Sequence, residues 1–490
     1  MIISFGTCAI LVGILLWKWW FTCKGSLAFD SSIPSLPGGS FLLGHLKVVE
    51  PMYGEEGVKY YTKWGRVHAR IMKMRFVFYY FLSTAHPDYV RDILRFKPEK
   101  GFMYDLTRDW IGDGILFSTK EKWSVRRKLL TPIFHFGALE AYTGSINKST
   151  NTFVDEIYKY GGYPIDLFQK SINLAMDTVL KCLLGYESNC QIAKNEYAEL
   201  MSTLAEISVD RLYSALQIFD WYFFRTKLGK EYLVQRARFW EIGYKLIEQR
   251  RYMHENNPHV LEDSKEDTFL DTLLKLKYED GTTLTTADIQ EELNTFMYAG
   301  HDTTACAISW SIYFLSLYPD HQTRCRDEVR KIMGDSGGFI TQEQIKSMSL
   351  LGMFIKEVLR LRPSVPYIAR KTDCDIKVGE HFIPNGTTLV ILVNSLHRLH
   401  EFWDDPDEFK PDRFTPAKSK NRHPFCYIPF GAGNRNCIGK NLALVEIKMA
   451  VAKILYNFEI KTIDPQSVTR RNAIVLRPVN LFVEFEPIDI

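Results

Sequence analysis

The sequence has almost no excess of charge of either sign, with 61 Lys and Arg against 58 Asp and Glu and a net charge of +3. A protein whose main task is to bind phosphate backbones carries a clear basic excess, so nucleic-acid binding is not expected. The nine cysteines are scattered, and no two form a Cys-x-x-Cys pair. This argues against a disulfide scaffold and finger-type zinc sites, and it favours a reducing compartment.

The rest of the composition is that of an ordinary globular protein. Of the 490 residues, 46% are hydrophobic and 24% are charged, which excludes disordered, collagen-like and coiled-coil chains. The sequence contains no internal repeat, and the polar segment 254–267 is expected to be a surface loop between helices. We therefore expect one large domain over residues 41–490.

The N-terminus differs from the remainder of the chain. Within residues 2–21 the only charge is Lys18, and about 20 apolar residues suffice to span a bilayer. Lys24 follows the run and no Lys or Arg precedes it, so the C-terminal bulk is expected in the cytosol. A cleaved signal peptide is the alternative, but it requires a basic region and a small-residue cleavage site that are missing. We expect a retained transmembrane anchor over residues 1–22 and a Pro/Gly hinge over 23–40.

The remaining sequence indicates a mainly helical protein with small β-sheets. Apolar residues recur at helical spacing through most of residues 87–252. Residues 75–83 are aromatic and β-branched and predict one strand. Residues 375–393 predict three short strands separated by Gly-containing turns, and residues 473–486 are also β-like.

One predicted helix is unusually long. Thr285 and Asp288 form an N-terminal capping signal and Pro319 ends the helical pattern. The helix over residues 286–318 would be roughly 50 Å long. Its middle, residues 299–304, reads AGHDTT, a poor helix-forming string whose glycine and hydroxyl groups invite a local distortion. Such a string in the longest helix indicates a functional segment.

A cysteine stands in a glycine-rich turn near the C-terminus. Residues 429–439 read PFGAGNRNCIG and are followed by a helical run from Lys440. Cys437 is therefore expected at a helix N-terminus, where the helix dipole and exposed amides stabilise a thiolate. Gly433 permits a positive φ for a tight loop, and Gly439 lets the backbone approach a large flat group.

Two further residues of this turn support a cofactor role. Phe430 would shield the sulfur, and Arg435 can reach an anionic group beside it. A lone cysteine is most often a small buried hydrophobe, but Phe-x-x-Gly-x-Arg-x-Cys-x-Gly is a far more demanding pattern. It resembles the haem-binding loop of the cytochrome P450 monooxygenases, which implies that Cys437 is the thiolate axial ligand of a haem iron.

The resemblance extends to other motifs in the order typical of the family. The chain has Glu-x-x-Arg at residues 357–360, Pro-Asp-Arg-Phe at 411–414, Trp-x-x-x-Arg at 123–127, and the string at 299–304. It covers residues 35–490. It implies the P450 fold, which is mainly α with small β-sheets in a single large haem-binding domain, here preceded by the N-terminal anchor.

The resemblance implies haem b, iron protoporphyrin IX, as the cofactor. Arginine suits the two propionates, and His397 matches a further propionate contact, although a surface histidine is an equally good interpretation. The residues matched to cofactor-binding positions are Trp123, Arg127, Arg370, His397, Phe430, Gly433, Arg435, Cys437 and Gly439.

Glu357 and Arg360 have a structural interpretation. They are three residues apart on one helical face and can pair, and Arg413 can join as a second cation. A buried carboxylate shared by two guanidiniums is costly to break. This triad is expected to brace the core and not to take part in catalysis.

The resemblance also implies a reaction, the insertion of one oxygen atom of O2 into a substrate. A thiolate ligand favours heterolytic O–O cleavage, which needs protons. Asp302 is assigned to proton relay and Thr303 to a hydrogen bond with the oxygen molecule, with Thr304 as second choice.

Electrons must come from another protein, because the chain has no flavin or dinucleotide fingerprint. We expect NADPH–cytochrome P450 reductase to supply them, with cytochrome b5 as a further candidate partner. A basic cluster would suit an acidic redox partner, and a solvated basic face is the plain alternative. It consists of Lys120, Lys122, Arg126, Arg127 and Lys128.

Within the superfamily, residues 112–118 and 294–298 look like those of the family-four group, which includes fatty-acid ω-hydroxylases. Many members have a Glu where this chain has Ala299, and that Glu can form an ester to haem. We therefore expect haem without this ester and doubt strict terminal-methyl selectivity. Most candidate pocket residues are apolar, which favours a lipophilic substrate, although several can simply be core. They are Phe102, Ile115, Leu293, Phe296, Ala299, Thr303, Val365, Ile368, Val475 and Leu476.

Two other functions remain open from the sequence. One is a thiolate-haem isomerase or dehydratase that acts on peroxides without a reductase. The other is a membrane-tethered haem protein that binds lipophilic ligands without catalysis. The resemblance to microsomal P450s places the chain in the endoplasmic reticulum membrane, in contact with membrane lipid and with its catalytic domain in the cytosol.

Overall fold

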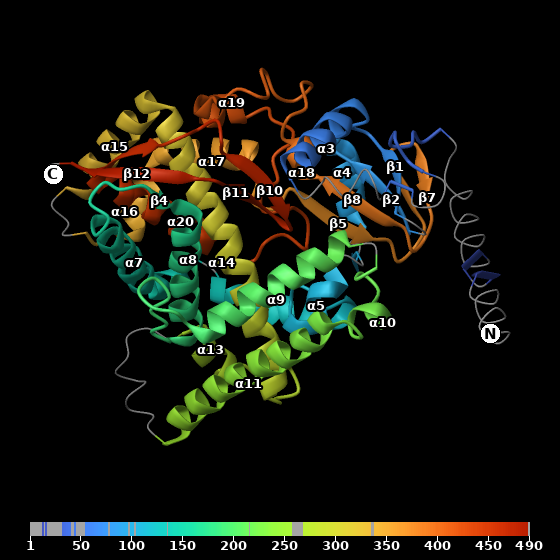
Figure 1. Ribbon diagram of the computed structural model, residues 1–490, viewed down its shortest axis with the longest axis horizontal. Coiled ribbons are helices and arrows are strands. Elements are labelled where there is room, and N and C mark those ends of the chain that lie inside the picture. The colour runs from blue at the N-terminus through green and yellow to red at the C-terminus, as the bar shows by residue number, and fades with distance from the viewer. Residues whose placement is uncertain are drawn as a thin grey trace. The chain divides into compact units, whose positions relative to one another are not determined.

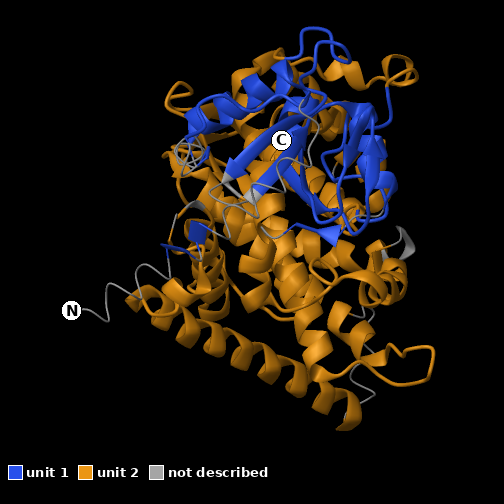
Figure 2. Cartoon of the chain, turned by 90° about the vertical axis from the view of Figure 1, so that its right-hand side faces the viewer, with its two compact units in different colours: residues 1–103, 367–406, 423–435 blue, residues 104–366, 407–422, 436–490 orange. Residues whose placement is uncertain are grey.

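The computed structural model of the protein (Figure 1) describes residues 12–13, 15–16, 32–40, 44–45, 54–76, 79–96, 99–101, 104–134, 136–214, 216–256, 268–334 and 338–488. The chain forms two compact units, each built from three parts of the sequence (Figure 2). Unit 1 consists of residues 1–103, 367–406 and 423–435, and unit 2 of residues 104–366, 407–422 and 436–490.

Unit 1 is built on a five-stranded sheet of order β1-β2-β8-β5-β3. β2 and β8 run parallel, and the other neighbours are antiparallel. All five residues of β8 are buried, as expected for a strand with a neighbour on each side. The elements of the sheet are β1 (Met72–Phe76), β2 (Tyr79–Thr84), β3 (Glu99–Lys100), β5 (Tyr367–Lys371) and β8 (Thr388–Leu392). Unit 1 also contains α3 (Glu55–Val67), α4 (Pro87–Arg95), the hairpin β6 (Ile376–Val378) and β7 (His381–Ile383), and α18 (Val393–Leu396).

The single strand predicted over residues 75–83 is wrong. The segment contributes to two antiparallel strands, β1 and β2, in which Phe76 pairs with Tyr79 and Met72 with Ser83. The segment contains no Gly, Pro, Asn or Asp, so its composition gave no signal for a reversal. The three strands predicted within residues 375–393 are confirmed as β6, β7 and β8.

Part of the predicted hinge packs against the five-stranded sheet within unit 1. Ile33 and Leu36 are buried. The amide of Leu36 donates to the carbonyl of Lys73 at 2.9 Å, and the amide of Lys73 donates to the carbonyl of Pro34 at 2.7 Å. This short stretch therefore runs along β1.

Unit 2 is mainly helical, and together with α4 of unit 1 this confirms the helical interpretation of residues 87–252 and the prediction of a mainly α fold with small sheets. Its helices before residue 276 are α5 (Asp105–Ile111), α6 (Lys120–Leu130), η3 (Thr131–Phe134), α7 (Phe136–Tyr158), α8 (Leu167–Leu184), α9 (Glu196–Tyr213), α10 (Asp220–Phe223), α11 (Lys227–Asn256) and α13 (Phe269–Lys275). Those after it are α14 (Thr286–Leu317), α15 (Pro319–Met333), α16 (Gln342–Ser347), α17 (Ser349–Leu361), η4 (Pro411–Phe414), α19 (Pro416–Ser419) and α20 (Lys440–Asn457).

The long helix predicted over residues 286–318 is confirmed as α14, which has 32 residues and contacts α8, α20, α17 and β11 (Figure 1). Thr285 and Asp288 form the expected capping box. The helix stays helical through residues 299–304, so the expected distortion does not interrupt it. Because most of its side chains are buried, α14 is the centre of the unit 2 core.

Two small sheets complete unit 2. One has the order β4-β12-β9, with β4 (Ile165–Asp166), β9 (Phe458–Thr462) and β12 (Phe482–Pro487). The other is the hairpin of β10 (Thr469–Ala473) and β11 (Val475–Val479), which reverses at Ile474 with φ of 69°. The β-like tail expected over residues 473–486 is confirmed as parts of three strands.

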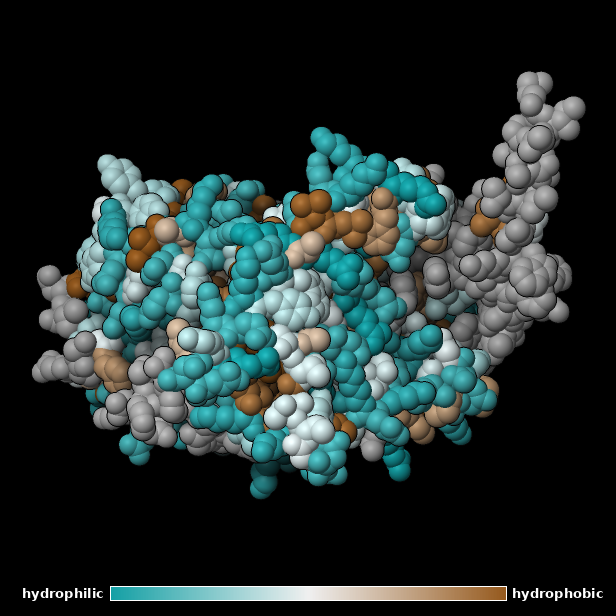
Figure 3. Space-filling model, turned by 90° about the horizontal axis from the view of Figure 1, so that it is seen from below, coloured by the Kyte–Doolittle hydropathy of each residue, from teal (hydrophilic) through white to brown (hydrophobic). Residues whose placement is uncertain are grey.

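Some predictions fall on residues outside the described ranges. These are most of the anchor over residues 1–22, residues 23–31 of the hinge, the pocket candidate Phe102, and residues 257–267 of the predicted surface loop. None of the helices in the described ranges is both long enough and apolar enough to cross a bilayer. On the face in Figure 3, hydrophilic side chains predominate and hydrophobic ones occur in small groups.

Candidate active site

Cys437 lies immediately before α20 in unit 2, as the sequence predicts. It is exposed, and Gly439 is the N-cap residue of α20. A Cβ placed on Gly439 would meet no heavy atom within 4 Å, so the space beside this backbone is open. The neighbouring apolar side chains are only half-buried, which is unusual for apolar residues next to a core helix; they are Ile438, Leu442, Ala443 and Leu444.

Arg127 from α6 lies beside this segment. Its guanidinium donates to the carbonyl of Asn436 at 2.9 Å and to Asn436 Oδ1 at 2.7 Å. Burial lowers the pKa of Arg127, while the nearby Cys437 acts in the opposite direction. The structure thus brings together two residues that the sequence matched to cofactor positions. Trp123, on the same helix, is half-buried.

The residues that precede this segment belong to unit 1. Gly433 has φ of +71°, so the positive φ expected at this position is confirmed. Arg435 donates to Glu99 Oε2 at 3.1 Å and is therefore held by a carboxylate of unit 1. Phe430 is half-buried.

Unit 1 also carries Arg370 and His397. Arg370 is buried on β5 and donates to the carbonyl of Ala369 at 2.9 Å. His397 follows α18 and is fully buried, so its interpretation as a surface histidine is wrong. Its Nε2 accepts the amide hydrogen of Ile428 at 2.9 Å, and its ring packs against Tyr427. The sequence around His397 could not predict this burial, because the contacts come from Tyr427 and Ile428, about 30 residues later in the chain.

Asp302 on α14 is held by an arginine that sequence reasoning missed. Arg477 on β11 donates to Asp302 Oδ2 through Nη2 at 2.6 Å and contacts both carboxylate oxygens through Nε at 3.1 and 3.2 Å. The side chains are only 9% and 11% exposed. Burial lowers the pKa of Arg477, but its contacts with Asp302 outweigh this and raise it. The only signal in the sequence was a single arginine among the apolar residues of a strand.

The hydroxyl of Thr303 donates to the carbonyl of Ala299 at 2.7 Å, one turn earlier in α14. The carbonyl of Thr303 accepts a hydrogen bond from the hydroxyl of Ser364 at 2.8 Å. Thr303 and Ala299 are half-buried, whereas Thr304 is buried. Thr303 is therefore better placed than Thr304 to meet a small molecule.

The structure brings Glu357, Arg360 and Arg413 together. Arg360 donates to both carboxylate oxygens of Glu357 at 2.7 and 2.8 Å, and Arg413 Nε donates to Oε1 at 3.0 Å. The amide of Lys410 donates to the same oxygen at 2.8 Å. Glu357 and Arg360 are fully buried, so the carboxylate is satisfied entirely by protein donors.

Carboxylates within unit 2 pair with three of the five cations of the basic cluster. Lys122 lies 2.9 Å from Glu291, Lys128 lies 2.7 Å from Glu279, and Arg126 pairs with Asp288. Arg127 binds Asn436, as described above. This pairing reduces the positive potential that the cluster could offer to an acidic partner.

Several pocket candidates are core residues in this structure. Leu293, Val475 and Leu476 are almost fully buried, and Phe296 stacks on Phe134 with ring centres 4.9 Å apart. Ile115 is buried at the segment between α5 and α6. Half-buried positions, which leave side-chain surface for a ligand, are Phe296, Ala299, Thr303, Val365 and Ile368.

Residues 34–485 match the protein-family model for Cytochrome P450. The chain belongs to the cytochrome P450 family. Rat Cytochrome P450 4F6 is 33% identical to this P450, over 99% of this chain and 92% of its own length. The human Ultra-long-chain fatty acid omega-hydroxylase is 30% identical, over 96% of this chain and 90% of its own.

The fold of the solved Cytochrome P450DA heme domain is also similar. It has a TM-score of 0.82 and 21% sequence identity, over 93% of this chain and 98% of that one. The resemblance inferred from the motifs is thus confirmed, and this P450 is a monooxygenase of a family that uses haem iron.

The residues of unit 2 fit such a group. An exposed thiol, the open backbone at Gly439 and the half-buried apolar turn of α20 offer a sulfur ligand and a surface for a flat apolar ring. Arg127 adds a cation for a carboxylate substituent. The protein would supply one ligand to the iron, the thiolate of Cys437. Among the described residues, no group of three His, Cys, Asp or Glu side chains could hold a metal ion without such a cofactor.

Proposed function

We propose that this P450 inserts one oxygen atom of O2 into a lipophilic substrate, such as a fatty acid, hydrocarbon, hormone-like lipid or xenobiotic. The observation that carries the proposal is the exposed Cys437 at the start of α20, with Arg127 beside it. The mostly apolar candidate pocket residues support a lipophilic substrate. A curated relative named as a fatty-acid omega-hydroxylase supports fatty acids as the first class to test.

Cys437 would hold a haem through its thiolate, and the bound haem would supply the redox chemistry that activates O2. Trp123, Arg127, Arg370 and Arg435 are proposed to bind its propionates. His397 is a weaker candidate because its Nε2 is already bonded to a backbone amide. Phe430, Gly433 and Gly439 are proposed to shape the backbone around the sulfur. Because Ala299 has no carboxylate, we propose that the haem is bound without an ester link.

Two side chains of α14 are proposed to handle protons. Thr303 must turn its hydroxyl hydrogen away from the carbonyl of Ala299 to donate to O2, a rotation about one bond. Asp302 must exchange part of its contact with Arg477 for a water molecule or a hydroxyl before it can pass a proton. The strength of the contact with Arg477 therefore sets how readily Asp302 transfers a proton.

We propose that electrons come from NADPH–cytochrome P450 reductase, with cytochrome b5 as a second candidate donor. We also propose that residues 1–22 anchor the chain in the endoplasmic reticulum membrane, with the hinge at 23–40 and the catalytic domain at 41–490 in the cytosol. A cytosolic catalytic domain should leave Asn385, which is exposed in the sequon Asn-Gly-Thr, without a glycan. A second sequon, Asn147 in Asn-Lys-Ser, is uninformative because Asn147 is buried.

The proposal is tested by replacing the thiolate. Cys437→Ala should abolish the red-shifted Soret band of the reduced carbonyl complex, because that band requires a thiolate ligand. Cys374→Ala is the matched control, since Cys374 is also exposed but lies in unit 1. Retention of the band in Cys437→Ala would refute the ligand assignment.

Activity is tested with fatty acids, reductase and NADPH. Oxygenated product that needs both reductase and NADPH would support the proposal. Turnover of a fatty-acid peroxide without them would instead favour the isomerase or dehydratase. Binding of lipids without any product would favour a carrier.

A further inference from the structure

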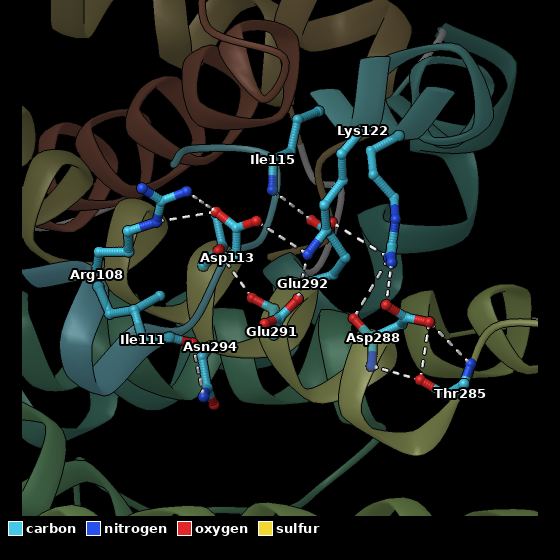
Figure 4. A network of polar contacts seen from close by, with 12 residues as sticks. Arg108, Ile111, Asp113, Ile115, Lys122, Thr285, Asp288, Glu291, Glu292 and Asn294 are labelled. Atoms are coloured by element: carbon cyan, nitrogen blue, oxygen red, sulfur yellow. Dashed lines mark hydrogen bonds and ion pairs between the residues drawn. The ribbon is translucent and has the colours of Figure 1, made fainter. Parts of the chain in front are cut away.

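A polar network within unit 2 joins the segment 112–118 to helices α6 and α14 (Figure 4). In its outer part, Arg108 Nε donates to Asp113 Oδ1 at 2.9 Å, and Lys122 Nζ lies 3.1 Å from Asp113 Oδ2. Lys122 also donates to Glu291 Oε2 at 2.9 Å. These four side chains are partly exposed, so their pairs are screened by water and contribute little energy.

The inner part of the network is buried and centres on Glu292. This side chain is 0% exposed, and its Oε2 accepts the amide hydrogen of Ile115 at 3.0 Å. Its Oε1 lies 3.5 Å from Nη1 of Arg126, which is 2% exposed and also pairs with Asp288. The carboxylate thus has one backbone donor and a share in one cation. A hydrogen bond to a buried charge is stronger than one between neutral groups.

The backbone just before Ile115 also lies against α14. A Cβ on Gly114 would lie 2.5 Å from the carbonyl oxygen of Glu291 and 2.3 Å from Thr295 Oγ1, so only glycine fits there. Asn294 Nδ2 donates to the carbonyl of Ile111 at 3.1 Å. The segment is therefore held at three places on one helix, and Glu292 supplies the buried charged contact.

The charge state of Glu292 is sensitive to its surroundings. Burial raises its pKa to about 7, against the lowering effects of the Ile115 amide, Arg126 and Lys122, while Glu291 raises it further. The other titratable groups in this network are Asp288, which shares Arg126, and Tyr278, whose ring lies 5.8 Å from the Arg126 guanidinium. Protonation would weaken Glu292 as an acceptor for the amide and remove its attraction to Arg126.

We propose that Glu292 is a positioning residue for the substrate: through the amide of Ile115 it fixes the segment 112–118 so that the Ile115 side chain meets the substrate at one place. The inference rests on the proposed function and on Ile115 as a pocket candidate from the sequence, whose side chain is mostly buried but keeps 7% of its surface exposed. It adds a residue that touches no substrate itself but sets which carbon is presented. Loss of the carboxylate should therefore change where a chain is hydroxylated.

Two substitutions separate the hydrogen bond from the charge. Glu292→Gln keeps an oxygen that can accept the Ile115 amide but removes the negative charge, and Glu292→Leu removes both. The matched control is Glu279→Gln, because Glu279 also pairs with a cation of α6, Lys128, but is 85% exposed. The reduced carbonyl spectrum of each variant verifies an intact haem–thiolate protein.

The readouts are the dissociation constant for a straight-chain fatty acid from the spectral shift, and the distribution of hydroxylated products. We expect Glu292→Leu to weaken binding roughly tenfold, as for loss of one charged hydrogen bond, and to spread hydroxylation over more carbons. Glu292→Gln should lie between it and the wild type, and Glu279→Gln should match the wild type. If the Glu292 side chain only filled space, Glu292→Leu, which is of similar size, would also match the wild type.

The pH dependence of the wild-type protein gives a second test that needs no variant. The product distribution should shift between about pH 6 and pH 8 as Glu292 ionises, and Glu292→Gln should remove this shift. A distribution that is independent of pH, together with an unchanged distribution and affinity in Glu292→Gln, would overturn the inference. If the wild type binds fatty acids but forms no product, the proposed function fails, while the binding constants still decide the role of Glu292.

Discussion

Replacing Arg477 with methionine removes the cation that holds Asp302 while keeping most of the side-chain volume. The ion pair is nearly buried, with side chains 9% and 11% exposed, and its shortest contact is 2.6 Å. Arg477 also lies 3.6 Å from Glu206, but that carboxylate is more than half exposed and can be solvated by water when the arginine is removed. Arg477→Met therefore leaves an unpaired carboxylate in the core of unit 2.

The cost follows from this burial. Breaking a buried ion pair by removing one partner costs about 3–5 kcal/mol. Unfolding of a 490-residue chain carries an entropy of about 1 kcal/mol per kelvin, so the midpoint of thermal unfolding should fall by about 3–5 °C. Asp302→Asn should cost less, about 1–3 kcal/mol, because asparagine keeps one oxygen that can accept from Arg477 and Glu206 still lies 3.6 Å from the guanidinium. The double variant should lose about 2–3 kcal/mol less than the sum of the single variants.

Thermal unfolding monitored by circular dichroism measures all three variants. Lys461→Met is the control, because its ion pair with Glu484 is exposed and long at 4.0 Å, and it should shift the midpoint by about 1 °C or less. Strictly additive losses in the single and double variants would refute the coupling between Asp302 and Arg477.

Three other predictions concern residues of unit 2. Glu357→Gln should cost about 3–5 kcal/mol and reduce haem incorporation, because it leaves the Arg360 and Arg413 guanidiniums without their shared carboxylate; unchanged thermal stability and haem content would contradict this. Burial raises the pKa of Glu446 to about 8, partly offset by a hydrogen bond from Thr178. The folded state therefore binds this proton more tightly than the unfolded state, and stability should fall as pH rises from about 5 to 8, by up to about 1.4 kcal/mol per pH unit more than in Glu446→Gln. Parallel pH–stability curves for the two proteins would show that Glu446 does not titrate in this range. Acid–acetone should extract all the haem, because Ala299 offers no carboxylate for an ester; haem that stays with the protein would disprove the assignment.

The sequence alone determined the family and the main elements. The cysteine turn, the Glu-x-x-Arg pair and the long capped helix are local patterns, in which spacing of three or four residues on one helix already places the side chains together. This is why the capping box at Thr285 and Asp288 and the helix that begins after Cys437 could be predicted. The fold followed because these motifs occur in one order along nearly the whole chain.

Contacts between residues far apart in the sequence were decided only by the tertiary structure. Arg477 meets Asp302 across 175 positions, and Glu292 meets the Ile115 amide across 177, and no local spacing encodes either contact. The strand reversal between β1 and β2 was likewise missed, because residues 75–83 contain no Gly, Pro, Asn or Asp that would signal a turn. The sequence specifies which side chains are present and which of them lie together on one helix. Tertiary packing decides which distant partner each buried charged group pairs with.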